Sequence, residues 1–154
     1  MKIGRLLALI GTILSIIGTF LFTLYSYINP VYGVGGIISL ASAFSLATSW
    51  IDFVLIIVFI IFILACIVQL IGIPNSISAI IGGGITLIFC VFIFLGVFGL
   101  IPGFTNGIGF LLDHTEWIPG VIPVTVELLG VGLGTYIATV GGIISLVSGF
   151  FPRE

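Results

Sequence analysis

The sequence predicts an all-α membrane protein: a bundle of four transmembrane helices with a short outer helix or re-entrant segment after the first span. Three observations lead to this fold class, namely composition, the length of the apolar runs, and the placement of charge at their ends. Of the 154 residues, 60% are hydrophobic and 5% are charged, and the mean hydropathy is +1.53. A soluble domain carries about 25% charged residues, so lipid is the expected solvent of this chain.

Four apolar runs have the length of about 20 residues that a spanning helix needs. They are Leu6–Ile28, Phe53–Ile73, Ile77–Ile101 and Val124–Phe151. Proline precedes or follows nearly every run, as expected where helices begin or end. Residues 1–154 are therefore expected to form one integral membrane domain, with an outer segment at 29–52 and an outer loop at 102–123. The first run follows two bases as a signal peptide would, but its length and the bulky residues after it favour an uncleaved span.

Charge predicts the orientation of these spans. The bases are Lys2, Arg5 and Arg153, which flank the first and last runs. Because basic flanks stay in the cytoplasm, four spans would place both termini on the cytoplasmic side of the cell membrane and the acids on the outer side. Those outer acids are Asp52, Asp113, Glu116 and Glu127. The net charge of −2 argues against nucleic-acid binding, which needs a basic surface.

Residues 31–50 are uncharged and long enough for a fifth span. Asn29-Pro30 before them and Asp52 after them leave almost no turn, and their Gly, Ser and Ala content makes them weakly apolar. A short outer helix on the bundle, or dipping into it, is the favoured interpretation. The stretch VGGIISL occurs at Val34–Leu40 and again at Val140–Leu146. The repeat reflects either a biased composition or two helices that present Gly and Ser to a neighbour.

Rows of small residues predict where the helices pack. Lipid offers little hydrophobic drive between helices, and small side chains let backbones approach closely. Gly4, Gly11 and Gly18 recur every seven residues and share one face of the first span. The candidate packing residues are Gly11, Ser15, Gly18 and Thr19 in the first span, and Gly130, Gly134, Ala138, Gly142 and Ser145 in the last.

The last span carries small residues on two faces. One face is expected to serve a contact within the bundle. The other can serve a second contact within it, or can dock another copy or another membrane protein. Under the docking interpretation, a bulky residue at Gly134 or Ala138 is expected to disrupt assembly.

Polar side chains at or beyond the outer ends of the runs form a candidate outer site of Asp113, His114, Glu116, Glu127 and Asp52. Asp113, His114 and Glu116 are all residue types that bind metals, but a site needs three or four converging ligands. We therefore expect no metal and no cofactor, and a solvated loop end or a contact with an outer partner instead. Glu127 is expected in the first turn of the last span, where the helix dipole favours a carboxylate. A cation site that joins Glu127 to Asp52 is the alternative.

Almost no ionisable residue is expected in the hydrocarbon core of the spans, and Gln69 is the strongest polar group there. Because ionisable groups inside spans mark proton and ion pathways, a coupled transporter is not expected. The expected function is non-catalytic and acts through helix packing, either as a homo-oligomer or as an accessory subunit of a larger membrane complex. The alternatives are an oligomeric channel for small solutes and a membrane enzyme that uses Asp113, His114 and Glu116.

The plan of four spans, a short inner loop at Gly72–Ser76 and an acidic second outer loop resembles the claudin-like and tetraspanin-like class in topology. The claudin Trp…Gly-Leu-Trp…Cys…Cys signature and the tetraspanin Cys-Cys-Gly motif are missing from this sequence. The opening KIGRLLALIGTILSIIGTF also resembles the starts of small prokaryotic four-span membrane proteins of unknown function. Neither resemblance assigns a role to any residue here.

Overall fold

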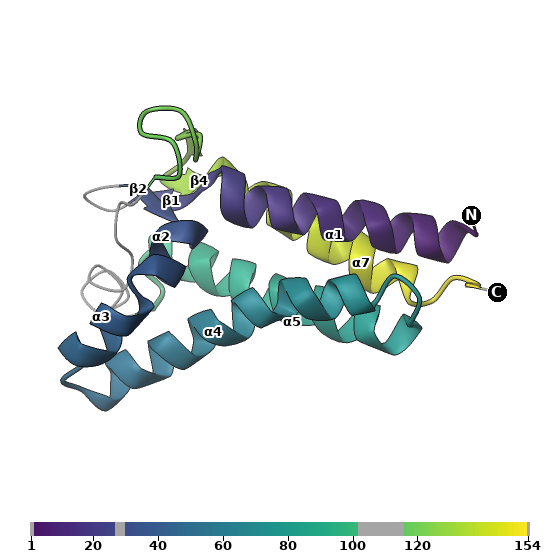
Figure 1. Ribbon diagram of the computed structural model, residues 1–154, viewed down its shortest axis with the longest axis horizontal. Helices are drawn as coiled ribbons and strands as arrows, with labels where there is room; N and C mark the ends of the chain where they lie inside the picture. The colour runs from purple at the N-terminus through teal and green to yellow at the C-terminus, as the bar shows by residue number, and fades with distance from the viewer. Residues whose placement is uncertain (1, 27–29, 102–115, 154) are drawn as a thin grey trace.

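A computed structural model describes residues 2–26, 30–101 and 116–153 of the chain (Figure 1). The protein is mostly helical, with 68% of the described residues in helices. Its helices are α1 (Ile3–Leu21), α2 (Gly33–Ile38), α3 (Leu40–Leu46), α4 (Trp50–Ile71), α5 (Ser76–Val97) and α7 (Leu133–Ser148). Its strands are β1 (Thr23–Ser26), β2 (Pro30–Tyr32), β3 (Glu127–Leu128) and β4 (Val131–Gly132). Within the described ranges, α1, α4 from Asp52 onward, and α5 are long and apolar enough to cross a membrane, whereas α7 is shorter at 16 residues.

The four longer helices lie side by side and form what we call the stem. Helix α7 packs against both α1 and α5, and α4 packs against α5 (Figure 1). Both chain ends lie at the same end of the stem, where Gly4 N donates to Pro152 O at 3.3 Å. The opposite end, which we call the head, contains the strands, α2, α3 and residues 116–126.

A small antiparallel sheet in the head has the strand order β2-β1-β4-β3. Strand β1 lies between β2 and β4, and Tyr25 of β1 is opposite Val131 of β4. Helix α1 runs almost directly into β1, and β4 runs directly into α7. The sheet is therefore a continuation of two stem helices, and its position relative to the stem is fixed through them.

The helices at the first and last predicted spans are shorter than expected, because the residues next to the head form strands. Helix α1 ends at Leu21 rather than Ile28, and the last helix occupies 133–148 rather than 124–151. Thr23 N donates to Val124 O at 3.1 Å, and Val124 N donates to Leu21 O at 2.8 Å. The β-branched and aromatic residues of these stretches suit a paired, half-buried strand. An apolar run cannot by itself distinguish such a strand from the end of a helix.

Two candidate residues change place as a consequence. Glu127 lies in β3, not in the first turn of the last helix. Gly130 lies outside the helix, in the turn between β3 and β4, where its φ is +80°. Gly130 therefore does not belong to the row of small residues on α7.

Helix α4 begins earlier than predicted because Ser49 and Asp52 cap it. Ser49 Oγ accepts from Asp52 N at 3.3 Å, and the Asp52 carboxylate accepts from Ser49 N at 2.9 Å. This reciprocal pair is a capping box, which satisfies amides at the helix start. Asp52 therefore lies in the first turn of α4 rather than before it. At the other end of the stem, Asn75 caps α5 by accepting from Ile77 N at 3.0 Å.

The segment 31–50 forms two short helices instead of one long one. Helix α2 has six residues and α3 has seven, and the chain changes direction at Ser39 between them. Neither helix has the length of a span, so the fifth-span alternative is wrong for this segment.

Candidate functional site

The three glycines that recur every seven residues in α1 form a line of contact with α7 and the residues that follow α7. A Cβ added to Gly11 would lie 2.5 Å from Ser145 N, and one added to Gly18 would lie 2.5 Å from Gly134 O. A Cβ on Gly4 would lie 2.7 Å from Phe151 O. These distances are shorter than any real Cβ contact. Only glycine therefore allows the two backbones to come this close, which is how small residues bring helices together.

The second small face of α7 packs against α5 of the same chain. A Cβ added to Gly83 of α5 would lie 2.6 Å from Leu146 N and 2.7 Å from Gly142 O. Ser145 Oγ donates to Ala79 O of α5 at 3.3 Å. Both faces of α7 thus meet neighbours within the chain, and α5 occupies the face considered above for an outside partner.

Ala138 and Gly134 belong to the face of α7 that meets α1. Gly18 approaches both residues, and Ala138 is completely buried. A bulky residue at either position would first disturb the packing of this chain. Ser15 and Thr19 are also completely buried, and their hydroxyl oxygens have no hydrogen-bond partner among the described residues. These positions therefore stabilise the stem rather than present a surface.

A polar cluster joins α1, α4 and α5 inside the stem. The side chain of Gln69 is completely buried, and its Nε2 donates to Thr86 Oγ1 at 2.6 Å and to Gly82 O at 3.3 Å. Thr12 Oγ1 donates to Ala8 O at 2.7 Å and lies 3.2 Å from Gln69 O. All these groups are neutral amides and hydroxyls. They can hold three helices together but cannot take up or release a proton near neutral pH.

Arg153 links the chain segments that meet at the end of the stem where the basic residues lie. Its side chain is only 7% exposed, and its Nη1 donates to the carbonyls of Gly72 and, at 3.0 Å, Ile73. Its Nη2 donates to Ser148 Oγ at 2.9 Å. Burial, and to a lesser degree the charge of Arg5, lowers the pKa of the guanidinium. Sequence reasoning used Arg153 only for orientation, because no local pattern reveals a contact 80 residues away in the chain.

The acidic side chains of the head accept hydrogen bonds from neighbouring groups. The Glu116 carboxylate accepts from Gly120 N, and its Oε1 lies 3.5 Å from Tyr32 Oη. Glu127 accepts from Ser26 Oγ, whereas Asp52 caps α4 as described above. Asp113 and His114 lie outside the described residues. Among the residues that are described, no three His, Cys, Asp or Glu side chains come together as metal ligands would.

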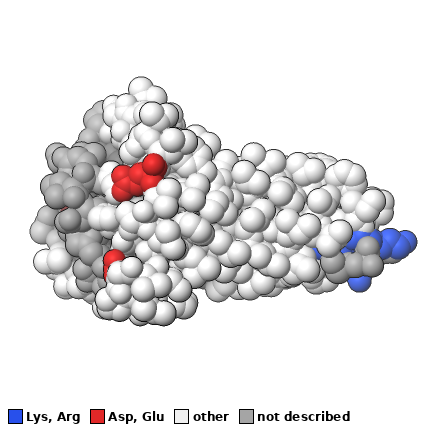
Figure 2. Space-filling model, turned by 90° about the horizontal axis from the view of Figure 1, so that it is seen from above, with Lys and Arg blue, Asp and Glu red and all other residues white. Residues whose placement is uncertain are grey.

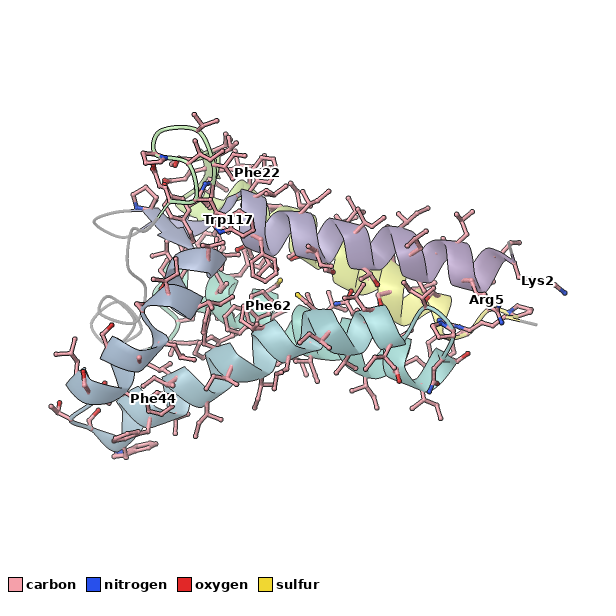
Figure 3. The ribbon with its side chains drawn as sticks, in the orientation of Figure 1. Lys2, Arg5, Phe22, Phe44, Phe62 and Trp117 are labelled. Atoms are coloured by element: carbon pink, nitrogen blue, oxygen red, sulfur yellow. The ribbon has the colours of Figure 1, made fainter. Side chains whose placement is uncertain are left out.

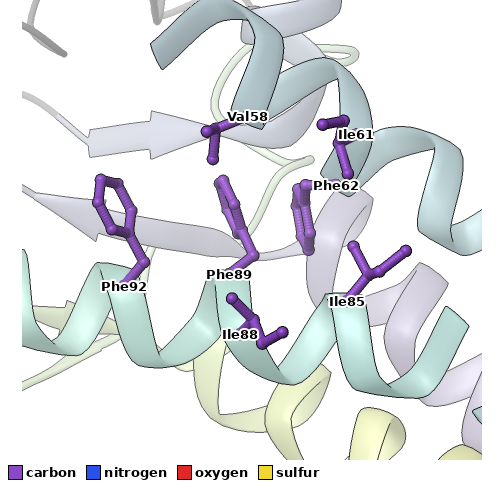
Figure 4. Close-up of a pocket in the computed structure, with 7 residues that line it drawn as sticks. All are labelled: Val58, Ile61, Phe62, Ile85, Ile88, Phe89 and Phe92. Carbon is purple, nitrogen blue, oxygen red and sulfur yellow. The ribbon is translucent and has the colours of Figure 1, made fainter. Parts of the chain in front are cut away.

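An apolar groove lies between α4 and α5 on the outside of the stem (Figure 4). Its volume is about 310 Å³, and its lining consists of Val58, Ile61, Phe62, Ile85, Ile88, Phe89 and Phe92. The rings of Phe62 and Phe89 stack with centroids 3.9 Å apart. Hydrocarbon side chains offer van der Waals contact to an apolar group, but they offer no nucleophile, acid or base. The groove can therefore accommodate an apolar chain without acting on it.

Charge is separated between the two ends of the molecule. Figure 2 shows the basic side chains at the narrow end of the stem and the acidic ones on the broader head. Among the described residues, the bases are Lys2, Arg5 and Arg153 and the acids are Asp52, Glu116 and Glu127.

Comparisons of the chain with known protein families, with curated proteins and with solved structures find no match.

Proposed function

We propose that this chain is a non-catalytic, four-span membrane protein that acts through protein–protein contact, with its head as the contact surface. It either assembles with itself or serves as an accessory subunit of a larger membrane complex. In this proposal the stem anchors the head, and the head determines the partner.

The length of α7 supports its assignment as the fourth span. At 1.5 Å per residue, its 16 residues extend about 24 Å. This length approaches the thickness of the hydrocarbon core, about 30 Å. The position of both chain ends at one end of the stem also fits an even number of spans (Figure 1).

The separation of charge supports the orientation. Basic residues flank membrane spans mainly on the cytoplasmic side. All three bases of the described chain lie at the end that holds both termini (Figures 2 and 3). The proposed orientation therefore places the termini in the cytoplasm and the head outside the cell membrane.

The observation that carries the proposal is the continuity between the closest helix pair and the sheet. Gly18 and Gly134 bring α1 and α7 into backbone contact, and a few residues farther on Tyr25 and Val131 pair β1 with β4. The side chain of Thr135 in α7 also donates to Leu24 O of β1 at 2.6 Å, which ties the helix to the sheet. A surface held this firmly on a rigid scaffold suits recognition, since binding groups are commonly positioned in this way.

The mass of the complex in native membranes tests this proposal. After mild cross-linking and solubilisation, native mass spectrometry should find a multiple of the 16.3 kDa chain, or that chain with a second membrane protein in fixed ratio. Glu127→Lys, at an exposed position of the sheet, should reduce the complex, whereas Lys2→Gln at the opposite end should not. A cross-linked mass of one chain would contradict the proposal, and solute flux through liposomes that contain only this protein would favour the channel.

A further inference from the structure

The head carries two tight turns whose tips are apolar and exposed. In the first, Val121 N donates to Ile118 O at 2.9 Å across Pro119-Gly120, and Gly120 has a φ of +74°. Proline followed by a glycine with positive φ is typical of a type II turn. Trp117, at the base of this turn, is 59% exposed, and Ile118 and Val121 are also exposed. The chain has no charged residue between Glu116 and Glu127.

The second turn joins β3 to β4 and places a leucine where leucine is unfavourable. Leu128 is opposite Val131, so only Leu129 and Gly130 form the loop. Their φ values are +57° and +80°, as in a type I′ turn, for which Asn-Gly is the preferred pair. A leucine in the left-handed region is rare because its Cβ is crowded there. Leu129 is nevertheless 76% exposed, and Leu128 beside it is also exposed. The strained position thus presents an apolar side chain outward, where asparagine would suit both water and the turn better.

The first turn stands out beside the stem rather than beyond its end. Figure 1 shows residues 116–126 projecting sideways from the outer end of α1. Figure 3 shows Trp117 at the level where α1 ends, at the end of the molecule away from Lys2 and Arg5. The second turn lies against the ends of α5 and α7 that adjoin the head. A Cβ on Gly130 would lie 3.3 Å from Val97 Cγ1, and Tyr136 Oη donates to Leu128 O at 3.1 Å.

We infer that these two turns seat the head in the outer interface of the bilayer, with Trp117, Ile118, Val121, Leu128 and Leu129 in contact with lipid. Tryptophan is enriched at the level of the headgroups, and apolar side chains bury themselves at the boundary with the acyl chains. The turns lie at the height where the spanning helices end, so the apolar surface of the stem continues onto them. This continuity favours lipid over a protein partner. The inference rests on the proposed spanning arrangement but not on any protein partner.

Tryptophan fluorescence tests the first turn, because the chain has only two tryptophans. Trp50→Phe leaves Trp117 as the only emitter in phosphatidylcholine vesicles. We expect blue-shifted emission, strong quenching by lipid brominated near the headgroup end of its chains, and little quenching by aqueous iodide. Adding Ile118→Asp and Val121→Asp should reverse this pattern, so that iodide quenches Trp117 strongly and brominated lipid quenches it little. Trp117 that iodide quenches fully and brominated lipid leaves unchanged would overturn the inference.

The second turn is tested with Leu129→Trp in a chain that also carries Trp50→Phe and Trp117→Phe. The inference requires quenching by brominated lipid here too, and an iodide-accessible tryptophan at this tip would overturn it. Circular dichroism of each variant verifies that it folds. Resistance of the vesicle-bound protein to alkaline carbonate reports the spanning arrangement separately. Because the vesicles contain only lipid and this chain, the result does not depend on whether the head also binds a protein.

Discussion

Gly18 of α1 and Gly134 of α7 hold their helices in direct backbone contact. A Cβ on Gly18 would lie 2.5 Å from the carbonyl oxygen of Gly134 and 2.7 Å from Ala138 N. The contact lies about one turn before the end of α1 and at the first turn of α7, where both helices adjoin the strands of the head. It therefore fixes the distance between α1 and α7 at the point where the sheet begins.

Gly18→Ala should destabilise the protein by about 1–3 kcal/mol, the usual cost of forcing an extra methyl group into a packed interface. The added Cβ meets backbone atoms of α7, which cannot move without separating the helices. The free energy of unfolding in mixed micelles, measured by titration with sodium dodecyl sulfate, reports this change. A Gly18→Ala protein as stable as the parent would show that α1 and α7 are farther apart than described.

Arg153→Ala should loosen the basic end of the stem. The guanidinium is the donor to the Gly72 and Ile73 carbonyls at the end of α4. Hydrogen bonds to a charged group contribute about 1.5–3 kcal/mol each, so we expect a loss of at least about 2 kcal/mol in the same titration. Arg5→Ala is the matched control, because Arg5 is exposed at the same end. Equal effects of the two substitutions would mean that charge, rather than the Arg153 contacts, is responsible.

Tyr25 should make the protein sensitive to alkali. Burial raises the pKa of its hydroxyl far above the ordinary value of about 10. Above pH 10 the unfolded chain therefore loses this proton while the folded chain keeps it, so stability falls as the pH rises. Tyr25→Phe should flatten this dependence between pH 10 and 11, relative to the parent. An unchanged slope would exclude Tyr25 as its source.

Gln69→Leu should change stability by less than about 1 kcal/mol, because interhelical hydrogen bonds in membranes contribute only about 0.6 kcal/mol on average. Thr86 Oγ1 keeps its own bond to Gly82 O at 3.0 Å, and the substitution removes Gln69 Oε1, which has no partner among the described residues. Gln69→Ala should cost more, about 2 kcal/mol, because it leaves a cavity. If leucine proved as damaging as alanine, the amide would matter more than its volume.

The parts of the fold that follow from hydropathy could be predicted, and those that depend on pairing could not. The runs around Phe59 and Phe89 are helices within a few residues of the expected bounds, and the stripe through Gly11 forms a helix contact. The strands at Thr23 and Val131 were not predicted because they continue apolar runs without interruption. The alternation in VTVEL and the turn pair Leu129-Gly130 were the available signals. Arg153 gave none, because its partners at Gly72 and Ile73 are distant in the sequence.

Gly83 and Gly84, neighbours on α5, provide the most direct test of whether the small residues hold this chain together. A Cβ on Gly83 would lie 2.6 Å from Leu146 N, whereas one on Gly84 would meet only Leu146 Cδ1 at 3.9 Å. Gly83→Ala should therefore lower the free energy of unfolding by about 1–3 kcal/mol, and Gly84→Ala should raise it by about 0.5–1 kcal/mol through helix propensity. If the two variants were equally stable and only the assembled mass of the Gly83→Ala protein changed, the account would be contradicted. The small residues of α5 and α7 would then contact an outside partner instead.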